Sequence, residues 1–154
     1  LRGNFIVENL KKYIQNSTND NDEIVLYSYW MNMDGYVAAK LKNKVNNRNI
    51  LKAVTRCHRV DVYEYADISN YIPMRNYIFD NIDNVFSISD DAIQYIKNTY
   101  NVDEKKLSIE RLGTTEFKID KLTKPDTIRL VSCSWMRPVK RIHLIVKALK
   151  KVRG

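Results

Sequence analysis

The stretch TRCHRVDVY, at residues 55–63, sets a histidine between two arginines and follows them with an aspartate. An imidazole can hold or transfer a proton near neutral pH, guanidinium groups bind anions, and a carboxylate accepts hydrogen bonds. A lone histidine is more commonly structural, but His58 lies just beyond the apolar run Ile50–Val54. Ligands of parallel sheets bind at such strand ends. We therefore predict that the site residues here are Arg56, His58, Arg59 and Asp61.

A second basic group occurs in VSCSWMRPVKRIHLI, which joins an apolar run to a segment with helical spacing. Lys140 and Arg141 open that segment, where the free N–H groups and partial positive charge of a helix N-terminus favour anions. Two cations oppose that helix dipole, and a bound phosphate would offset the cost. The loop lacks the GxxxxGK pattern of a Walker loop, and a chain with four glycines contains no GxGxxG. We assign His143, between apolar positions, to packing or to the surface.

The elements that must position these residues alternate between short β-branched runs and segments of helical periodicity. We predict strands at Glu23–Tyr29, Ile50–Val54, Asn84–Ser89, Lys106–Leu112 and Thr127–Cys133, and helices at Phe5–Ser17, Asp34–Val45, Asp90–Tyr100 and Arg141–Val152. Ser89 or Asp90 is the expected N-cap of one of these helices. Strands that are apolar on both faces and alternate with helices indicate the α/β class, with a parallel sheet flanked by helices.

Polar and aromatic residues gather where the predicted strands end, which is the edge where an open parallel sheet binds its ligands. In strand order they are Tyr29, Trp30 and Met31; Arg56, His58, Arg59 and Asp61; Ser87, Ser89 and Asp90; Gly113 and Thr114; and Ser132, Ser134 and Trp135.

The composition is that of a folded globular chain of 154 residues, with 44% hydrophobic and 29% charged residues. No apolar run approaches the roughly 20 residues of a membrane span, and the first residues lack the apolar core of a signal peptide. We therefore expect a cytoplasmic protein. Cys57 and Cys133 belong to no CxxC pattern or Cys/His cluster, so we expect buried, reduced thiols rather than a disulfide scaffold or a zinc site.

The organisation along the chain suggests a segment of a longer protein. Residues 113–126, GTTEFKIDKLTKPD, lose periodicity and read as a linker. The part after them holds one predicted strand and one helix, too little to bury a core of its own. An amphipathic helix opens the chain almost at once. We expect strands to precede it and the remainder of a second domain to follow.

The ordered segments SYWMNMDGYVAAKLK, VTRCHRVDVYEY, YIPMRNYIFDNIDNVFSISDDAIQYIKNTY, KLSIERLGT and IRLVSCSWMRPVKRIHLIVKALKKV resemble glycosyltransferase family 4, the group 1 glycosyltransferases. The resemblance is greatest to the branch that makes bacterial lipopolysaccharide, capsule and exopolysaccharide. It implies a partial GT-B fold of two Rossmann-like domains. Residues 1–112 would be the C-terminal part of the acceptor-side domain, 113–126 the interdomain linker, and 127–154 the truncated start of the donor-side domain.

The resemblance also implies an activity. The parent would be a retaining glycosyltransferase that moves a sugar from a nucleotide-sugar to a glycan or lipid-linked acceptor, without a metal or other cofactor, and this segment alone would be inactive. His58 falls on the histidine near the transfer point and is the catalytic candidate. Acceptor or sugar binding is assigned to Arg56, Arg59, Asp61 and Trp30, and donor diphosphate binding to Lys140, Arg141 and Ser134. Ser134 replaces the arginine usual in that motif, and Cys133 its glycine.

Two other interpretations remain open. Residues 127–154 carry eight of the 26 basic residues and no acid, which would suit a basic anion-binding module for nucleic acid or an anionic membrane surface. Its helix has no interleaved aromatics, so we expect no nucleic-acid partner, whereas peripheral contact with the inner face of the cell membrane is compatible with it. In the third interpretation the chain is a structural half-domain that forms a homodimer through its tail.

Overall fold

The structure of the protein, a computed structural model, describes residues 2–19, 21–44, 50–116, 118 and 126–152. The chain divides into two compact units, Leu1–Thr114 and Thr115–Gly154. The division falls inside the segment 113–126 that the sequence predicts as a linker.

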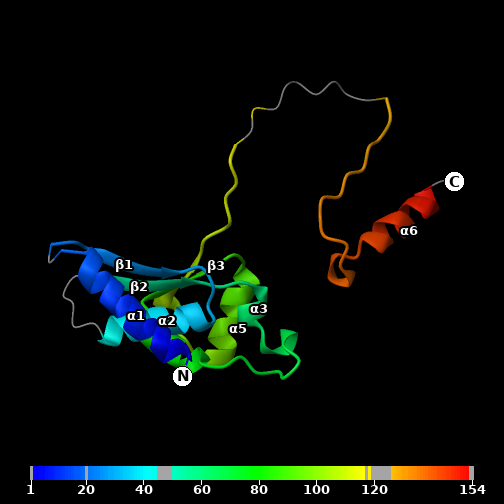
Figure 1. The fold of residues 1–154 in the computed structure, drawn as a ribbon. Coiled ribbons are helices and arrows are strands. Elements are labelled where there is room, and N and C mark those ends of the chain that lie inside the picture. The colour runs from blue at the N-terminus through cyan, green and yellow to red at the C-terminus, as the bar shows by residue number, and fades with distance from the viewer. Residues whose placement is uncertain (1, 20, 45–49, 117, 119–125, 153–154) are drawn as a thin grey trace. The chain divides into compact units, whose positions relative to one another are not determined.

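The first unit is built on a parallel sheet of four strands (Figure 1). They are β1 (Ile24–Ser28), β2 (Ile50–Arg56), β3 (Asn84–Ser87) and β4 (Leu107–Ile109), and they lie side by side in chain order. All three neighbouring pairs are parallel. The fold is therefore α/β, with a Rossmann-like sheet flanked by helices, as the sequence predicts.

The two faces of the sheet differ in burial, as the period of two along a strand requires. Thr55 of β2 pairs with Val85 of β3, and both are completely buried. On the opposite face of β1, Val25 and Tyr27 are about half exposed. One face of the sheet thus carries the helices and the core.

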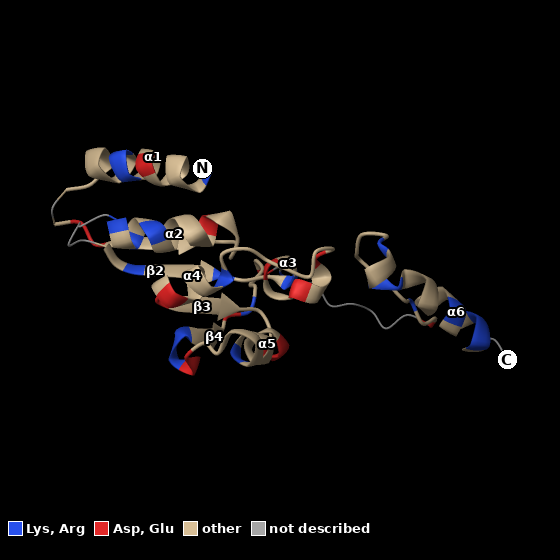
Figure 2. Ribbon diagram, turned by 90° about the horizontal axis from the view of Figure 1, so that it is seen from below, with Lys and Arg blue, Asp and Glu red and all other residues tan. Residues whose placement is uncertain are grey.

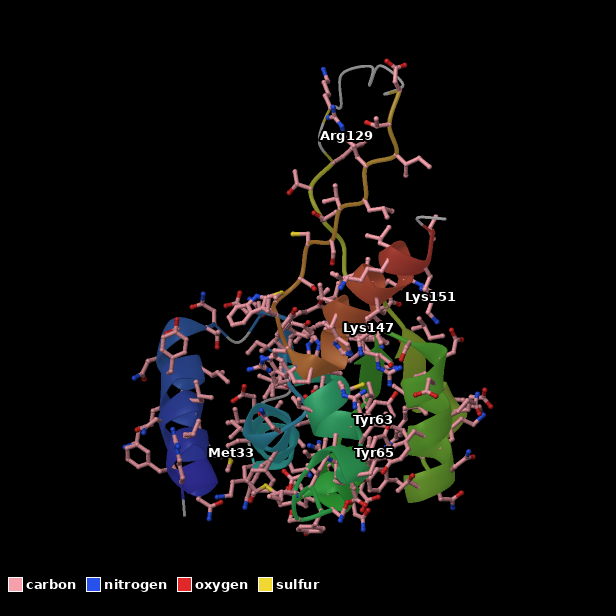
Figure 3. All side chains as sticks on the ribbon, turned by 90° about the vertical axis from the view of Figure 1, so that its right-hand side faces the viewer. Met33, Tyr63, Tyr65, Arg129, Lys147 and Lys151 are labelled. Carbon is pink, nitrogen blue, oxygen red and sulfur yellow. The ribbon has the colours of Figure 1, made fainter. Side chains whose placement is uncertain are left out.

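Two helices pack against each other next to β1 (Figure 1). They are α1 (Arg2–Ser17) and α2 (Met33–Lys44), close to the predicted bounds. Val7 of α1 packs with Val37 and Leu41 of α2. The helices approach closely at Gly3, where an added Cβ would lie 2.9 Å from the Tyr36 ring and 3.0 Å from the sulfur of Met33, which is labelled in Figure 3.

The segment between β2 and β3 contains helices that the sequence analysis did not predict. They are α3 (Arg59–Val62), the 3-10 turn η1 (Glu64–Ala66) and α4 (Arg75–Asn81). All are too short to show a helical period in the sequence. The predicted helix α5 (Asp90–Tyr100) has the expected bounds and N-cap, since the Ser89 side chain accepts from the N–H of Ala92 at 3.3 Å.

The main core lies between these helices and the sheet. It contains buried residues from both layers, namely Met31, Ala38, Ala39, Ala53, Cys57, Val62, Tyr63, Ile78, Phe79, Ile82, Val85, Ala92 and Ile96. Cys57 is buried as predicted.

A further short turn, η2 (Glu104–Lys106), leads from α5 into β4.

The second unit contains a 3-10 turn, η3 (Pro138–Lys140), and helix α6 (Ile142–Val152). The prediction of a strand at Thr127–Cys133 is wrong, because these residues have no strand structure. A strand requires a partner for its backbone N–H and C=O groups, and the described part of this unit offers none. Cys133 is exposed, against the prediction of a buried thiol. The cluster of basic residues on α6 is visible in Figure 2.

Candidate functional site

The carboxyl ends of the strands meet at one edge of the sheet, as the parallel register requires. Ser28 at the end of β1 pairs with Thr55, Arg56 at the end of β2 pairs with Phe86, and Ser87 at the end of β3 pairs with Ile109. The loops after β1 and β2 therefore emerge next to each other. This adjacency brings together residues that are about 30 positions apart in the sequence.

Three aromatic rings form a cluster at this edge, from Tyr29 and Trp30 after β1 and His58 after β2. The His58 ring centroid lies 4.3 Å from that of Trp30 and 4.9 Å from that of Tyr29, and the Tyr29 and Trp30 rings meet edge to face at 5.9 Å. Tyr29 is 47% exposed and Trp30 is 37% exposed. The cluster therefore presents apolar ring surface to solvent beside a group that can form hydrogen bonds.

The His58 ring is also held by the backbone. Its Nε2 lies 3.1 Å from the carbonyl oxygen of Tyr29. A carbonyl only accepts, so this contact assigns the proton to Nε2. In the neutral ring Nδ1 is then the acceptor, the role that a group positioning or deprotonating a hydroxyl must have.

Asp61 lies beneath this cluster, where it is 2% exposed. Its Oδ1 accepts from the backbone N–H of His58 at 2.5 Å, and its Oδ2 accepts from that of Met31 at 2.7 Å. Burial raises the pKa of Asp61, and the two N–H donors and the nearby Arg75 oppose that rise. Asp61 thus ties the loop after β1 to the loop after β2.

Arg75, the first residue of α4, holds Met31 from the other side. Its Nη1 donates to the Met31 carbonyl, and the side chain is 3% exposed. Burial lowers the pKa of Arg75, while the charge of Asp61 opposes that change. Met31 is therefore fixed at both its N–H and its carbonyl by buried charged groups, which also fixes the adjacent Trp30. Sequence reasoning missed Arg75, whose one signal was a charge within the aromatic, apolar stretch YIPMRNYIF.

The two arginines beside His58 differ in their surroundings. Arg56 is half-buried and is held by its Nε donating to the Tyr27 hydroxyl at 3.2 Å and its Nη1 donating to the Glu110 carbonyl at 2.5 Å. Arg59 is exposed at the start of α3. Arg56 therefore links β1, β2 and the end of β4, and Arg59 faces solvent.

The remaining polar residues at this edge serve the fold. Ser28 donates to Thr55 at 2.7 Å in the buried layer below α2, where an added Cβ at Gly35 would lie 3.3 Å from the Thr55 hydroxyl. Ser87 donates to the Ser89 carbonyl at 3.0 Å in the turn that starts α5. These side chains form hydrogen bonds within the sheet and in the turn before α5.

A tyrosine cluster lies next to α5, between Tyr63, Tyr65 and Tyr95. Tyr63 and Tyr65 are labelled in Figure 3, and their ring centroids are 5.1 Å apart. The Tyr63 hydroxyl donates to Asp91, and burial together with that carboxylate raises the pKa of Tyr63 to about 12. The Asp91 bond anchors the start of α5 to the end of α3.

In the second unit, two of the predicted diphosphate residues, Lys140 and Arg141, directly precede α6. Lys140 ends η3, and Arg141 stands immediately before α6 with a left-handed backbone, at φ 51°. Ser134 is exposed in a bend. Both cations therefore precede the free N–H groups of the first turn, as expected. The joint action of these residues with His58 stays a prediction.

Comparison with models of known protein families, with curated proteins and with solved structures gives no match. Among the described residues, no group of three or more His, Cys, Asp and Glu side chains is placed to hold a metal ion. The described part of the chain contains no helix long and apolar enough to cross a membrane.

Proposed function

We propose that this chain is the acceptor-side portion of a retaining, nucleotide-sugar-dependent glycosyltransferase of the GT-B type, joined to the beginning of its donor side. The observation that carries the proposal is the exposed cluster of Tyr29, Trp30 and His58 at the carboxyl edge of a parallel sheet. Flat rings offer apolar contact to the C–H face of a sugar, and an adjacent imidazole offers a hydrogen-bond acceptor to its hydroxyls.

Each residue has a role in this proposal. His58 positions an acceptor hydroxyl through Nδ1 near the reacting carbon. General-base action, in which Nδ1 also takes the hydroxyl proton, is a further role beyond positioning. Asp61 acts indirectly, since both of its oxygens are engaged by backbone N–H groups. Exposed Arg59 is available to an anionic acceptor, whereas Arg56 maintains the edge.

The departing nucleoside diphosphate carries the charge that develops in the transition state, and fixed positive groups lower its energy. In the proposal Lys140, Arg141 and the first turn of α6 supply these groups, and Ser134 contributes a hydroxyl. The proposal assigns no step to a metal. The nucleotide-sugar is a co-substrate rather than a resident cofactor.

The acceptor part of the proposal is tested by the fluorescence of Trp30. The chain has two tryptophans, so Trp135→Phe leaves Trp30 as the sole emitter. Titration with methyl glycosides of glucose, galactose, mannose and N-acetylglucosamine should change its emission, with a Kd of about 1 mM for a half-site. Tyr29→Ala should remove the response, and the exposed Tyr13→Ala on α1 should preserve it. Unchanged emission with every sugar would contradict the proposal.

The donor part is tested by binding of UDP and GDP, followed by phosphorus NMR. Lys140→Ala should reduce the affinity, whereas Lys147→Ala, which removes a charge from the second turn of α6, should reduce it much less. Equal effects of the two substitutions would mean that only net charge matters, and the assignment of Lys140 would fail.

A second candidate function is a basic anion-binding surface on α6. It is favoured by the placement of His143, Lys147, Lys150 and Lys151 on one face of an otherwise aliphatic helix. Such a helix can bind the headgroups of an anionic bilayer. Sedimentation with vesicles containing phosphatidylserine, compared with retention on single-stranded DNA, tests it. If the chain binds neither, the second candidate fails and only the sugar-transfer proposal remains.

A further inference from the structure

A cavity of about 190 Å³ lies in the first unit, beside the start of α4. Its lining includes Glu64, Tyr71, Arg75, Asn76 and Tyr100. None of the three rings of the aromatic cluster belongs to that lining. The cavity is therefore distinct from the surface to which the proposed function assigns sugar binding.

Two side chains of this lining carry three buried polar atoms without hydrogen-bond partners. Arg75 uses Nη1 on the Met31 carbonyl, but its Nε and Nη2 have no hydrogen-bond partner among the described residues. The buried hydroxyl of Tyr100 has none either within hydrogen-bond geometry. Each unmet group costs about 1–3 kcal/mol when it is shielded from water. The three unmet atoms belong to Arg75 and Tyr100, two residues that line the same cavity, and a ligand that accepts hydrogen bonds would satisfy them.

The unpaired edge of Arg75 has a specific shape. Nε–H and Nη2–H point in parallel from one side of the planar guanidinium, and this fork matches the two oxygens of a carboxylate. Burial and a hydrogen-bonding interaction with the Glu64 carboxylate raise the pKa of Tyr100, so its hydroxyl keeps its proton and can donate to an anion once Glu64 turns away. The size of the cavity lies below the roughly 300 Å³ at which pockets begin to hold drug-sized ligands.

We propose that this cavity binds a small carboxylate anion, with its two oxygens on Nε and Nη2 of Arg75 and a third hydrogen bond from the Tyr100 hydroxyl. A lining side chain rotates before the anion enters, because each of these atoms exposes less than 1 Å² to solvent. Glu64 is half-buried and Tyr71 is 61% exposed, so these two side chains have room to move. Glu64 also repels the anion and thereby sets the affinity.

The experiment is an NMR titration of the full chain, observed at the Nε–H of Arg75 and the ring of Tyr100. The probes are acetate and pyruvate, with sodium sulfate and sodium chloride at matched ionic strength as the other arms. We expect saturable shifts with acetate or pyruvate below about 50 mM. Tyr100→Phe should weaken binding about five- to tenfold through the lost hydrogen bond. Glu64→Gln should tighten it at least severalfold by removing the repulsion.

Tyr13→Phe is the matched control, since it removes a hydroxyl from an exposed position on α1, and it should leave the affinity unchanged. Arg75→Lys should abolish binding by removing the fork. If that variant does not fold, the two lining substitutions still decide the question. Equal shifts with sulfate and acetate would overturn the carboxylate assignment. An absence of saturable shifts in both the wild type and Glu64→Gln would overturn the site.

Discussion

At the residue scale, the charged groups at the carboxyl edge divide into those that face solvent and those that hold backbone. Asp61 and Arg75 belong to the second kind, because they bind the N–H and the carbonyl of Met31 from inside the core. Removing one partner of such a buried set leaves the other group without compensation. Their effect on binding by the aromatic cluster is therefore indirect, through the position of Trp30.

Asp61→Asn tests this clamp. The amide keeps the shape but has one acceptor oxygen, so the N–H of either His58 or Met31 loses its partner. We expect the free energy of unfolding to fall by about 1–3 kcal/mol in urea denaturation, with a change in Trp30 emission. Asp80→Asn, at an exposed position of α4, should change the free energy of unfolding by less than about 0.5 kcal/mol. Equal stability of the two variants would show that the clamp contributes nothing.

The two cysteines should react very differently. Burial, together with the charge of Asp61, raises the pKa of Cys57 to about 12, whereas Cys133 is exposed. At pH 8 a disulfide reagent such as DTNB should therefore modify one thiol in the native chain and both in urea. Cys133→Ser should show no fast reaction. Two fast thiols in the native wild-type chain would contradict the burial of Cys57.

The same shift gives stability a defined pH dependence. The pKa of Cys57 in the folded chain lies above its unfolded value of about 8.5. Below about pH 8.5, the protonated thiol therefore makes its full contribution to the free energy of unfolding. It is lost as pH rises toward about 12, by about 1.4 kcal/mol per pH unit from this thiol. Urea denaturation at a series of alkaline pH values measures the slope. A free energy of unfolding that stays constant from pH 9 to 11 would contradict it.

At the element scale, the sequence predicts what is long and periodic. The strands of the first unit and helices α1, α2, α5 and α6 follow from apolar spacing, and Ser89 marks the start of α5. The short helices α3 and α4 have too few turns to repeat a pattern, so Arg75 could not be placed. The run Thr127–Cys133 has the composition of a strand but no neighbouring strand among the described residues of its unit, and pairing is a tertiary property that composition does not contain.

Ser89→Ala tests the element boundary that the sequence identifies most directly. The Ser89 hydroxyl accepts from the N–H of Ala92 at 3.3 Å, and loss of an N-cap costs about 1 kcal/mol. We expect thermal or urea unfolding to show that loss. Gln94→Ala, at an exposed position within α5, keeps the cap and should leave stability unchanged or slightly raised. Restoration by Ser89→Asp would separate capping from a simple packing effect.

At the scale of the whole molecule, charge is segregated along the chain. The chain has 26 basic and 18 acidic residues, and residues 127–154 hold eight of the basic ones and no acid, so residues 1–126 are balanced at 18 of each. The entire formal charge of +8 therefore belongs to the C-terminal segment. Lys150 and Lys151 follow Lys147 by three and four residues, a spacing that puts all three on one face of α6; Lys147 and Lys151 are labelled in Figure 3.

This segregation predicts that polyanion binding depends on where charge is removed. Substituting Lys147, Lys150 and Lys151 by Gln, or substituting the exposed Lys12, Lys52 and Lys105 by Gln, removes three positive charges in either case. The two variants therefore have the same net charge. The salt concentration at which the protein elutes from heparin should fall sharply for the α6 variant and only slightly for the other. Affinity for a polyanion follows the number of anionic groups that the clustered cations contact. Equal elution of the two variants would show that net charge alone governs binding and that α6 forms no anion-binding surface.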